Sequence, residues 1–300
     1  MTEREGGAGQ RVAAIVVTYN RADVLRGTLI AIKEQECPPA AVLVVDNASQ
    51  DRTAAVVAAE FPEVTYCRLD ENLGFGAGLD AGIAHAQRED FDYFWLLDDD
   101  SRPAPAALRR SLEEARKIPR LGVLGLAGGE LRWGGFGPPS RLPVGGGRLS
   151  DPPAARRCDF VMLDGALVPR EAVEAQGRPR GDFFMMLEDV EYTTRMRRAG
   201  FEVGELDHGR SLIERAHLGS GGDGQRTMPW RGYYQTRNHL LIAVEHRSPV
   251  ELLAWFGRQL KFIVAALAFH DRKAERIRLR MLGVWHALRG VRGKTIEPGP

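Results

Sequence analysis

A short apolar run that leads directly into three acids constrains this chain more than any other stretch. Residues 94–97 are continuously apolar, and Asp98, Asp99 and Asp100 follow them without a break. Such a run indicates a strand buried on both faces of a parallel sheet. Three consecutive carboxylates cannot stay buried without partners, so they must lie at the strand's carboxyl end, in water or on a metal ion. That edge binds ligands in open α/β sheets, although an acidic turn would give the same local pattern.

Predicted strands and helices alternate from residue 11 to residue 126. This alternation is typical of βαβ units around a parallel sheet, and crossover handedness places all the strand carboxyl ends at one edge. Residues 18–20, 46–47 and 98–100 should therefore converge there. Asn20 is expected to cap the helix that runs through Leu25, Leu29 and Ile32. The other predicted helices are 53–60, 79–87 and 106–117, and the predicted strands are 11–18, 42–45, 64–69, 93–97 and 121–126.

The next part of the chain has a less regular pattern. Residues 128–150 are rich in Gly and Pro, which favours a loop or an irregular hairpin. Residues 188–199 are predicted to form a helix, with Gly200 as its C-terminal stop. Strand sequence is predicted at 159–168, 203–206 and 211–216, a short helix at 170–176 and a glycine loop at 219–224.

The C-terminal residues are basic and amphipathic. Residues 248–251, Ser-Pro-Val-Glu, are a capping box with proline at the first helical position, and they open a helix that extends through Leu267. A second helix is predicted from Arg272 to Leu288. Residues 251–300 contain ten Lys or Arg and four Asp or Glu. Such a segment is typical of a surface that packs on a partner or a second copy, or that lies on a membrane, and both interpretations stay open.

Composition limits the domain organisation and the class of partner. We expect a disordered N-terminus (1–10), an α/β domain (11–245) with a nucleotide-binding half (11–127) and an acceptor or catalytic half (128–245), and a helical extension (246–300).

The net charge of +1 is unlike that of a uniformly basic nucleic-acid-binding protein. Three isolated cysteines, no apolar leader and no membrane-spanning run predict a cytoplasmic location, in solution or peripheral to the membrane's cytoplasmic face.

The residues at the predicted sheet edge suit a nucleotide and a metal ion. Asp46 can accept hydrogen bonds from a base or ribose edge. Asp98 and Asp100 can hold a divalent cation through oxygen ligands, which Mg²⁺ and Mn²⁺ prefer, and that cation would stabilise a diphosphate leaving group. Glycines at 74, 76 and 78 would let the backbone approach the nucleotide closely.

Five motifs in order resemble those of family 2 glycosyltransferases, which are inverting enzymes of GT-A fold. The resemblance covers roughly residues 11–220 and implies an α/β fold with a Rossmann-like, mostly parallel sheet flanked by helices. The C-terminal segment from Tyr233 is similar to the bacterial rhamnosyl- and galactofuranosyltransferase branch. The motifs are Val-Val-Thr-Tyr-Asn-Arg from residue 16, Val-Asp-Asn-Ala-Ser from 45, Asn-Leu-Gly-Phe-Gly from 72, Leu-Asp-Asp-Asp from 97 and Leu-Glu-Asp-Val-Glu-Tyr from 187.

The resemblance implies a role for each matching residue. Asp98 and Asp100 match the metal-binding motif for Mn²⁺ or Mg²⁺, and His217 matches a histidine that completes the metal site in several relatives. Asp189 matches the general base, with Glu188 beside it. A carboxylate at a helix start is favoured by the helix dipole and can take a proton from an acceptor hydroxyl. The residues implied to bind the donor are Thr18, Tyr19, Asn20, Asp46, Asn72, Gly74, Asp98 and Asp99.

The implied reaction transfers a sugar from a UDP- or dTDP-sugar to a hydroxyl of a glycan or lipid-linked precursor. The Gln-x-x-Arg-Trp motif of processive synthases is absent, which favours addition of one or a few sugars. Residues Trp230, Arg231, Tyr234 and Arg237 either bind an acceptor or a phosphate, or simply pack the sheet edge. Two other functions stay open, a nucleotidyltransferase and a non-catalytic nucleotide-sugar-binding subunit, and the chain could form a homo-oligomer.

Overall fold

The structure is a computed structural model that describes residues 10–132, 135–137, 154–216, 228–269 and 271–299. Its strands are β1 (Val12–Thr18), β2 (Ala41–Asp46), β3 (Thr65–Arg68), β4 (Tyr93–Asp98), β5 (Ser101–Pro103), β6 (Leu121–Gly125), β7 (Gly128–Arg132), β8 (Gly135–Gly137), β9 (Ala155–Arg157), β10 (Phe160–Val161), β11 (Ala166–Pro169), β12 (Glu202–Leu206) and β13 (Ile213–Arg215). Its α-helices are α1 (Ala22–Lys33), α2 (Thr53–Glu60), α3 (Phe75–Ala86), α4 (Ala107–Ala115), α5 (Arg170–Gln176), α6 (Glu188–Arg198), α8 (Pro229–Glu245), α9 (Pro249–Phe269) and α10 (Lys273–Leu288).

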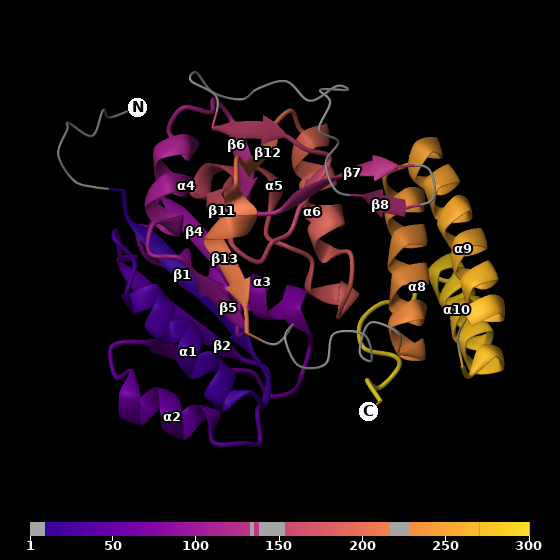
Figure 1. Cartoon of the computed structure of the whole chain (residues 1–300), viewed down its shortest axis with the longest axis horizontal. Coiled ribbons are helices and arrows are strands. Elements are labelled where there is room, and N and C mark those ends of the chain that lie inside the picture. The colour runs from indigo at the N-terminus through magenta and orange to yellow at the C-terminus, as the bar shows by residue number, and fades with distance from the viewer. Residues whose placement is uncertain (1–9, 133–134, 138–153, 217–227, 270, 300) are drawn as a thin grey trace.

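An eight-stranded sheet in the order β3-β2-β1-β4-β11-β6-β12-β9 forms the centre of the molecule (Figure 1). The pairs among β1, β2, β3 and β4 are all parallel, whereas β11 and β9 run antiparallel to their neighbours. In the register, Thr18 lies opposite Asp46, and Val17 lies opposite Asp98. The three strand ends therefore converge at one edge, as the alternation of strands and helices predicts.

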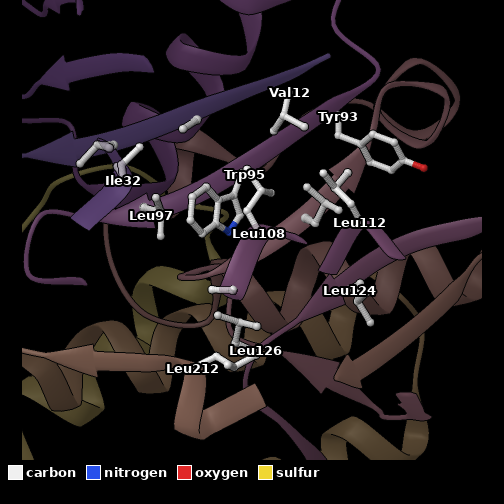
Figure 2. Close-up of a cluster of buried hydrophobic side chains, with 14 of the residues drawn as sticks. Val12, Ile32, Tyr93, Trp95, Leu97, Leu108, Leu112, Leu124, Leu126 and Leu212 are labelled. Carbon is white, nitrogen blue, oxygen red and sulfur yellow. The ribbon is translucent and has the colours of Figure 1, made fainter. Parts of the chain in front are cut away.

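The side chains of the central strands divide into two hydrophobic layers. Along β1, Val12, Ala14 and Val16 join the cluster under α1 and α4, which Figure 2 shows around Trp95 and Leu108. Ala13, Ile15 and Val17 join the opposite cluster, with residues of α3, α5 and α6. Every residue of β1 is buried, because helices cover both faces of the sheet.

Several predicted elements differ from the observed ones. Asn20 does not cap α1: the cap position is Arg21, whose side chain makes no capping hydrogen bond, and the Ala22 backbone N–H donates instead to Asp51 Oδ2 at 3.0 Å. The predicted strand 159–168 is two strands, β10 in a small sheet with β7 and β8, and β11 in the main sheet. Helix α3 begins at Phe75, four residues earlier than predicted. Residues 1–9 of the predicted disordered N-terminus and the whole predicted glycine loop at 219–224 lie outside the described residues.

The sequence analysis predicts no helix at residues 229–245, where the structure has α8. This helix connects the C-terminal helices to the rest of the molecule. It packs against α9 and α10, and the three helices lie together at one end of the molecule (Figure 1). The capping hydrogen bond at α9 is as predicted, because the Glu251 backbone N–H donates to Ser248 Oγ at 3.2 Å. Among the described residues, no helix is both long and apolar enough to cross a bilayer.

Candidate active site

The three acids after β4 form a compact cluster. Asp98, Asp99 and Asp100 each offer a carboxylate oxygen within 4.8 Å of the others. Asp99 already has protein partners, because Thr18 Oγ1 donates to it at 2.9 Å and Arg21 Nη1 at 3.0 Å. Burial and the neighbouring carboxylates raise the pKa of Asp98 well above its ordinary value. A cluster of this kind favours a bound cation, and Asp98 and Asp100 have the oxygens to hold it.

A fourth acid, Asp164, links the three-acid cluster to strand β11. The sequence alone does not indicate this contact. Asp164, just before β11, accepts from the Asp98 backbone N–H at 3.0 Å, and Arg215 of β13 pairs with it at 2.6 Å. Ser101 Oγ also donates to Asp164. The end of β4 is therefore fixed by residues more than sixty positions further along the chain.

Asp46 lies deeper than its predicted role implies. Its side chain is fully buried, and it accepts hydrogen bonds from the Ser49 backbone N–H, Tyr66 Oη and Arg68 Nη1. The next residue, Asn47, lines the cleft at this edge. Asn20 is also occupied, because its Oδ1 accepts from the Gln50 backbone N–H at 2.6 Å. Asp46 is thus buried beneath the cleft edge, whereas Asn20 is exposed and binds the loop at Gln50, and neither lines the cleft.

The glycine segment packs directly against the loop that leads to α6. Gly74 has φ +89°, and a Cβ there would lie 1.7 Å from the Phe184 carbonyl oxygen. Asn72 Oδ1 accepts from the Gly74 backbone N–H, and Asn47 Nδ2 donates to the Gly74 carbonyl. The requirement for glycine therefore comes from backbone approaching backbone.

A cleft of about 420 Å³ opens at the carboxyl edge of the sheet. Of the predicted donor-binding residues, Thr18, Tyr19, Asn72, Gly74, Asp98 and Asp99 line it, and Asn20 and Asp46 do not. Trp230 and Arg231 line it from α8. The other lining residues are Val17, Arg21, Asn47, Phe75, Phe184, Met185, Met228, Pro298 and Gly299.

Glu188 and Asp189 begin α6, where the sequence predicts a helix. Burial raises the pKa of Asp189 to about 6, against the opposing effects of backbone hydrogen bonds and of Arg258 and Arg215. Burial and the charge of Asp189 raise the pKa of Glu188 to about 8. Burial therefore raises the pKa of both carboxyls, despite their position at the start of a helix.

Two of the four predicted acceptor residues are structural. Arg237 and Tyr234 are fully buried in α8. Arg237 donates to the carbonyls of Phe183 and Gly293, and Tyr234 Oη donates to the carbonyl of Ile296. They hold the C-terminal residues to the body and are not available to an acceptor. His217, the predicted third metal ligand, lies outside the described residues.

Sequence reasoning missed three charged residues at this edge, Arg21, Asp164 and Arg215. Arg21 stands inside the Thr-Tyr-Asn-Arg motif, so the motif itself was an available signal. Asp164 and Arg215 carry no such signal, because they come together only through the pairing of β11 and β13 with distant strands.

The chain matches a known family in its N-terminal part. Residues 13–144 match the sequence model described as Glycosyl transferase family 2. The match covers less than half of the chain. The match is shorter than the resemblance expected over residues 11–220, and it contains the acid cluster, Asp46 and the glycine segment.

Two similar proteins are named as sugar transferases. Galactofuranosyltransferase GlfT1 of Mycolicibacterium smegmatis is 35% identical over 101 residues, 34% of this chain and 33% of the relative. N-acetylglucosaminyl-diphospho-decaprenol L-rhamnosyltransferase of Mycobacterium tuberculosis is 24% identical over 232 residues, 68% of this chain and 76% of the relative. The chain spans about a third of the length of the galactofuranosyltransferase.

Solved structures confirm the GT-A fold. S. aureus TarS 1–349 in complex with UDP-GlcNAc aligns with a TM-score of 0.61 at 15% identity, covering 94% of this chain and 82% of that one. Mannosyltransferase PcManGT from Pyrobaculum calidifontis in complex with GDP-Man and Mn²⁺ aligns with a TM-score of 0.57 at 16% identity, covering 93% and 87%. At these identities the likeness concerns the fold alone.

Proposed function

We propose that this chain is a metal-dependent, inverting glycosyltransferase that moves a sugar from a UDP- or dTDP-sugar to a hydroxyl of a glycan or glycolipid precursor. The observation that carries the proposal is the cleft at the sheet edge, which brings Thr18, Asp98, Asp99 and Gly74 together within the residues that match the family 2 model. Addition of one or a few sugars fits the absence of the processive-synthase motif.

The donor's nucleotide would lie between β1 and the glycine segment. The side chains of Asn47 and Tyr19 and the backbone at Gly74 line this part of the cleft, and they offer both polar groups and a ring face. Arg21 and Arg231 line the same cleft and could pair with diphosphate oxygens, because guanidinium groups bind phosphate well.

A divalent cation would be held by Asp98 and Asp100. The fit rests on two features: the crowded carboxylates within 4.8 Å of one another, and the raised pKa of Asp98, which a cation would reverse. When bound, Mn²⁺ or Mg²⁺ supplies positive charge that stabilises a nucleoside diphosphate as a leaving group. Asp99 keeps its hydrogen bonds to Thr18 and Arg21 and positions the cluster.

Asp189 would act as the general base. Its carboxylate takes the proton of the acceptor hydroxyl while the oxygen attacks the anomeric carbon, on the face opposite the bond to the diphosphate. That bond breaks in the same displacement, so the configuration inverts and no covalent enzyme intermediate forms. The transition state is oxocarbenium-like, as in glycoside hydrolysis, and a base with a pKa near 6 suits work close to neutral pH.

The test of this proposal is Asp189→Asn, assayed with a panel of UDP- and dTDP-sugars. We expect transfer to fall at least about a thousandfold while donor affinity stays within about twofold, because a base acts only on the acceptor proton. Glu63→Gln is the control, since Glu63 is an exposed acid that pairs only with Lys33 at 3.1 Å. Transfer by Asp189→Asn near the rate of the unaltered protein would remove Asp189 as the base.

A further inference from the structure

Helix α9 exposes an apolar face to solvent. Eight of the fifteen large exposed hydrophobic residues among the described residues lie on this helix, and three more lie on α10. Leu253 is 54% exposed and Leu260 is 62% exposed. On α9 the exposed large side chains are Val250, Leu252, Leu253, Phe256, Leu260, Ile263, Val264 and Leu267.

These residues form one broad stripe along the helix. Leu253, Phe256, Leu260, Val264 and Leu267 recur at intervals of three and four, so they share one face. The helix contains three charged residues; Glu251 and most of Arg258 face the protein, which leaves Lys261 as its exposed charge. A surface helix of a soluble protein normally presents polar residues to water, so an apolar face of this size marks a contact site.

The opposite face of α9 packs beside the predicted base. Trp255 joins the hydrophobic cluster that contains Leu187 and Val190, the residues on either side of Glu188 and Asp189. Arg258 lies close enough to Asp189 for its charge to act on that carboxyl. The exposed apolar stripe is therefore separated from the base region by about one helix diameter, roughly 10–12 Å.

The charge around this surface favours an anionic partner. Residues 261–280, which include the end of α9 and the start of α10, hold six Lys or Arg and two acids. Arg280 points into the protein, where it donates to Thr236 and Gln259, and Arg272 and Arg276 pair with the two acids, so Lys261, Lys273 and Arg278 supply the excess positive charge. A parallel pairing of two α9 helices would bring these cations together, and α9 exposes no acid to balance them. Anionic lipid headgroups would be attracted by the same cations while the acyl boundary covers the leucines.

We propose that the outer face of α9 lies in the interfacial layer of an anionic bilayer, parallel to its plane, so that a lipid-linked acceptor reaches Asp189 from the membrane surface. The role of Asp189 rests on the proposed function, whereas the docking of α9 does not. The proposal narrows the predicted membrane surface from the whole helical extension (246–300) to α9, which carries most of the exposed large apolar side chains among the described residues.

The experiment is co-sedimentation of the full chain with two kinds of vesicle. The unaltered protein should bind vesicles of phosphatidylglycerol and phosphatidylethanolamine and bind neutral phosphatidylcholine vesicles more weakly. Phe256→Glu/Leu260→Glu should lower the partition coefficient at least about tenfold, because it places charges where the acyl boundary would lie. Ile30→Glu on α1 is the matched control, an exposed apolar residue outside this face, and it should leave binding unchanged.

Further arms separate this proposal from its competitors. Lys261→Glu should reduce the preference for anionic vesicles, and Asp189→Asn should lose transfer but keep vesicle binding. Phe256→Glu/Leu260→Glu should still hydrolyse or transfer the donor sugar with a water-soluble acceptor. No sedimentation of the unaltered protein, or equal sedimentation of the double variant, would overturn the docking. A dimer by light scattering that dissociates in the double variant, without vesicle binding, would assign the face to a second copy instead.

Discussion

Replacing Gly74 by alanine should show how closely the donor cleft depends on one backbone approach. Gly74 has φ +89° and ψ 176°, a region that side chains strongly disfavour. Gly177 has nearly the same conformation, φ 77° and ψ −179°. A Cβ at Gly177 would make only an ordinary contact of 3.5 Å with Arg195 Nη1, whereas a Cβ at Gly74 would lie 1.7 Å from the Phe184 carbonyl oxygen. Gly177→Ala is therefore a matched control that isolates the clash.

The magnitudes follow from these geometries. The strained backbone should cost each variant about 1–3 kcal/mol in free energy of unfolding. Gly74→Ala should cost about 1–3 kcal/mol more, because relieving the clash requires the loop at Phe184 to move. That movement displaces Phe184 and Met185, which line the cleft. Donor affinity should therefore fall at least about tenfold in Gly74→Ala and stay unchanged in Gly177→Ala.

Urea denaturation gives the free energies of unfolding, and titration with UDP gives the affinities. The reasoning fails if the two variants lose equal stability within about 0.5 kcal/mol, since the carbonyl contact would then have no energetic consequence. It also fails if Gly74→Ala is the less stable variant yet binds UDP normally, because the cleft would then be independent of this approach.

Three further predictions concern the acids. Since burial raises the pKa of Asp189 to about 6, kcat/KM should rise with pH through that value, and a flat profile between about pH 5 and 7 would contradict the assignment. The raised pKa means that the folded state favours the protonated form of Asp189, and this contribution to stability is lost as pH rises through about 6. Asp189→Asn should therefore be more stable than the unaltered protein at about pH 8 and no more stable at about pH 4. Chelation should stop sugar transfer, and added Mn²⁺ should restore transfer by the unaltered protein but not by Asp98→Asn. Full activity in the presence of a chelator, with no metal bound, would exclude the proposed metal site.

The N-terminal half of the fold, residues 11–127, could be predicted from sequence because its signals are local. Each parallel strand, such as Val12–Thr18, is an apolar run followed by an amphipathic helix, and handedness then fixes where the strand ends meet. Helix α8 carried no such signal, because Thr236, Arg237, Asn238 and His239 are all fully buried and interrupt its hydrophobic period. Their partners come from other elements, including Gln259 on α9 and Glu251, and cannot be identified before those elements are placed.

The same limit explains why the sequence left two interpretations open at residues 230–237. Arginine with neighbouring aromatics at 230–237 predicts ligand binding or packing equally well, and only the placement of the C-terminal residues decides between them. Gly293 and Ile296 supply the carbonyls that Arg237 and Tyr234 bind, which makes those two side chains structural. Trp230 and Arg231, at the start of the same helix, stay in the cleft. One turn of α8 therefore separates residues that can meet a ligand from residues that cannot.

The surroundings of Asp189 tie the C-terminal helices to the chemistry. Two arginines lower the pKa of this carboxyl against the effect of burial: Arg215, which pairs with Asp164 behind the acid cluster, and Arg258, which comes from α9. Without Arg258 the Asp189 carboxyl would stay buried but lose part of the positive charge that opposes the effect of burial. Its pKa would then rise further, and a smaller fraction of Asp189 would be ionised near neutral pH. If Asp189 is the base, as proposed, helix α9 would contribute to its ionisation through Arg258.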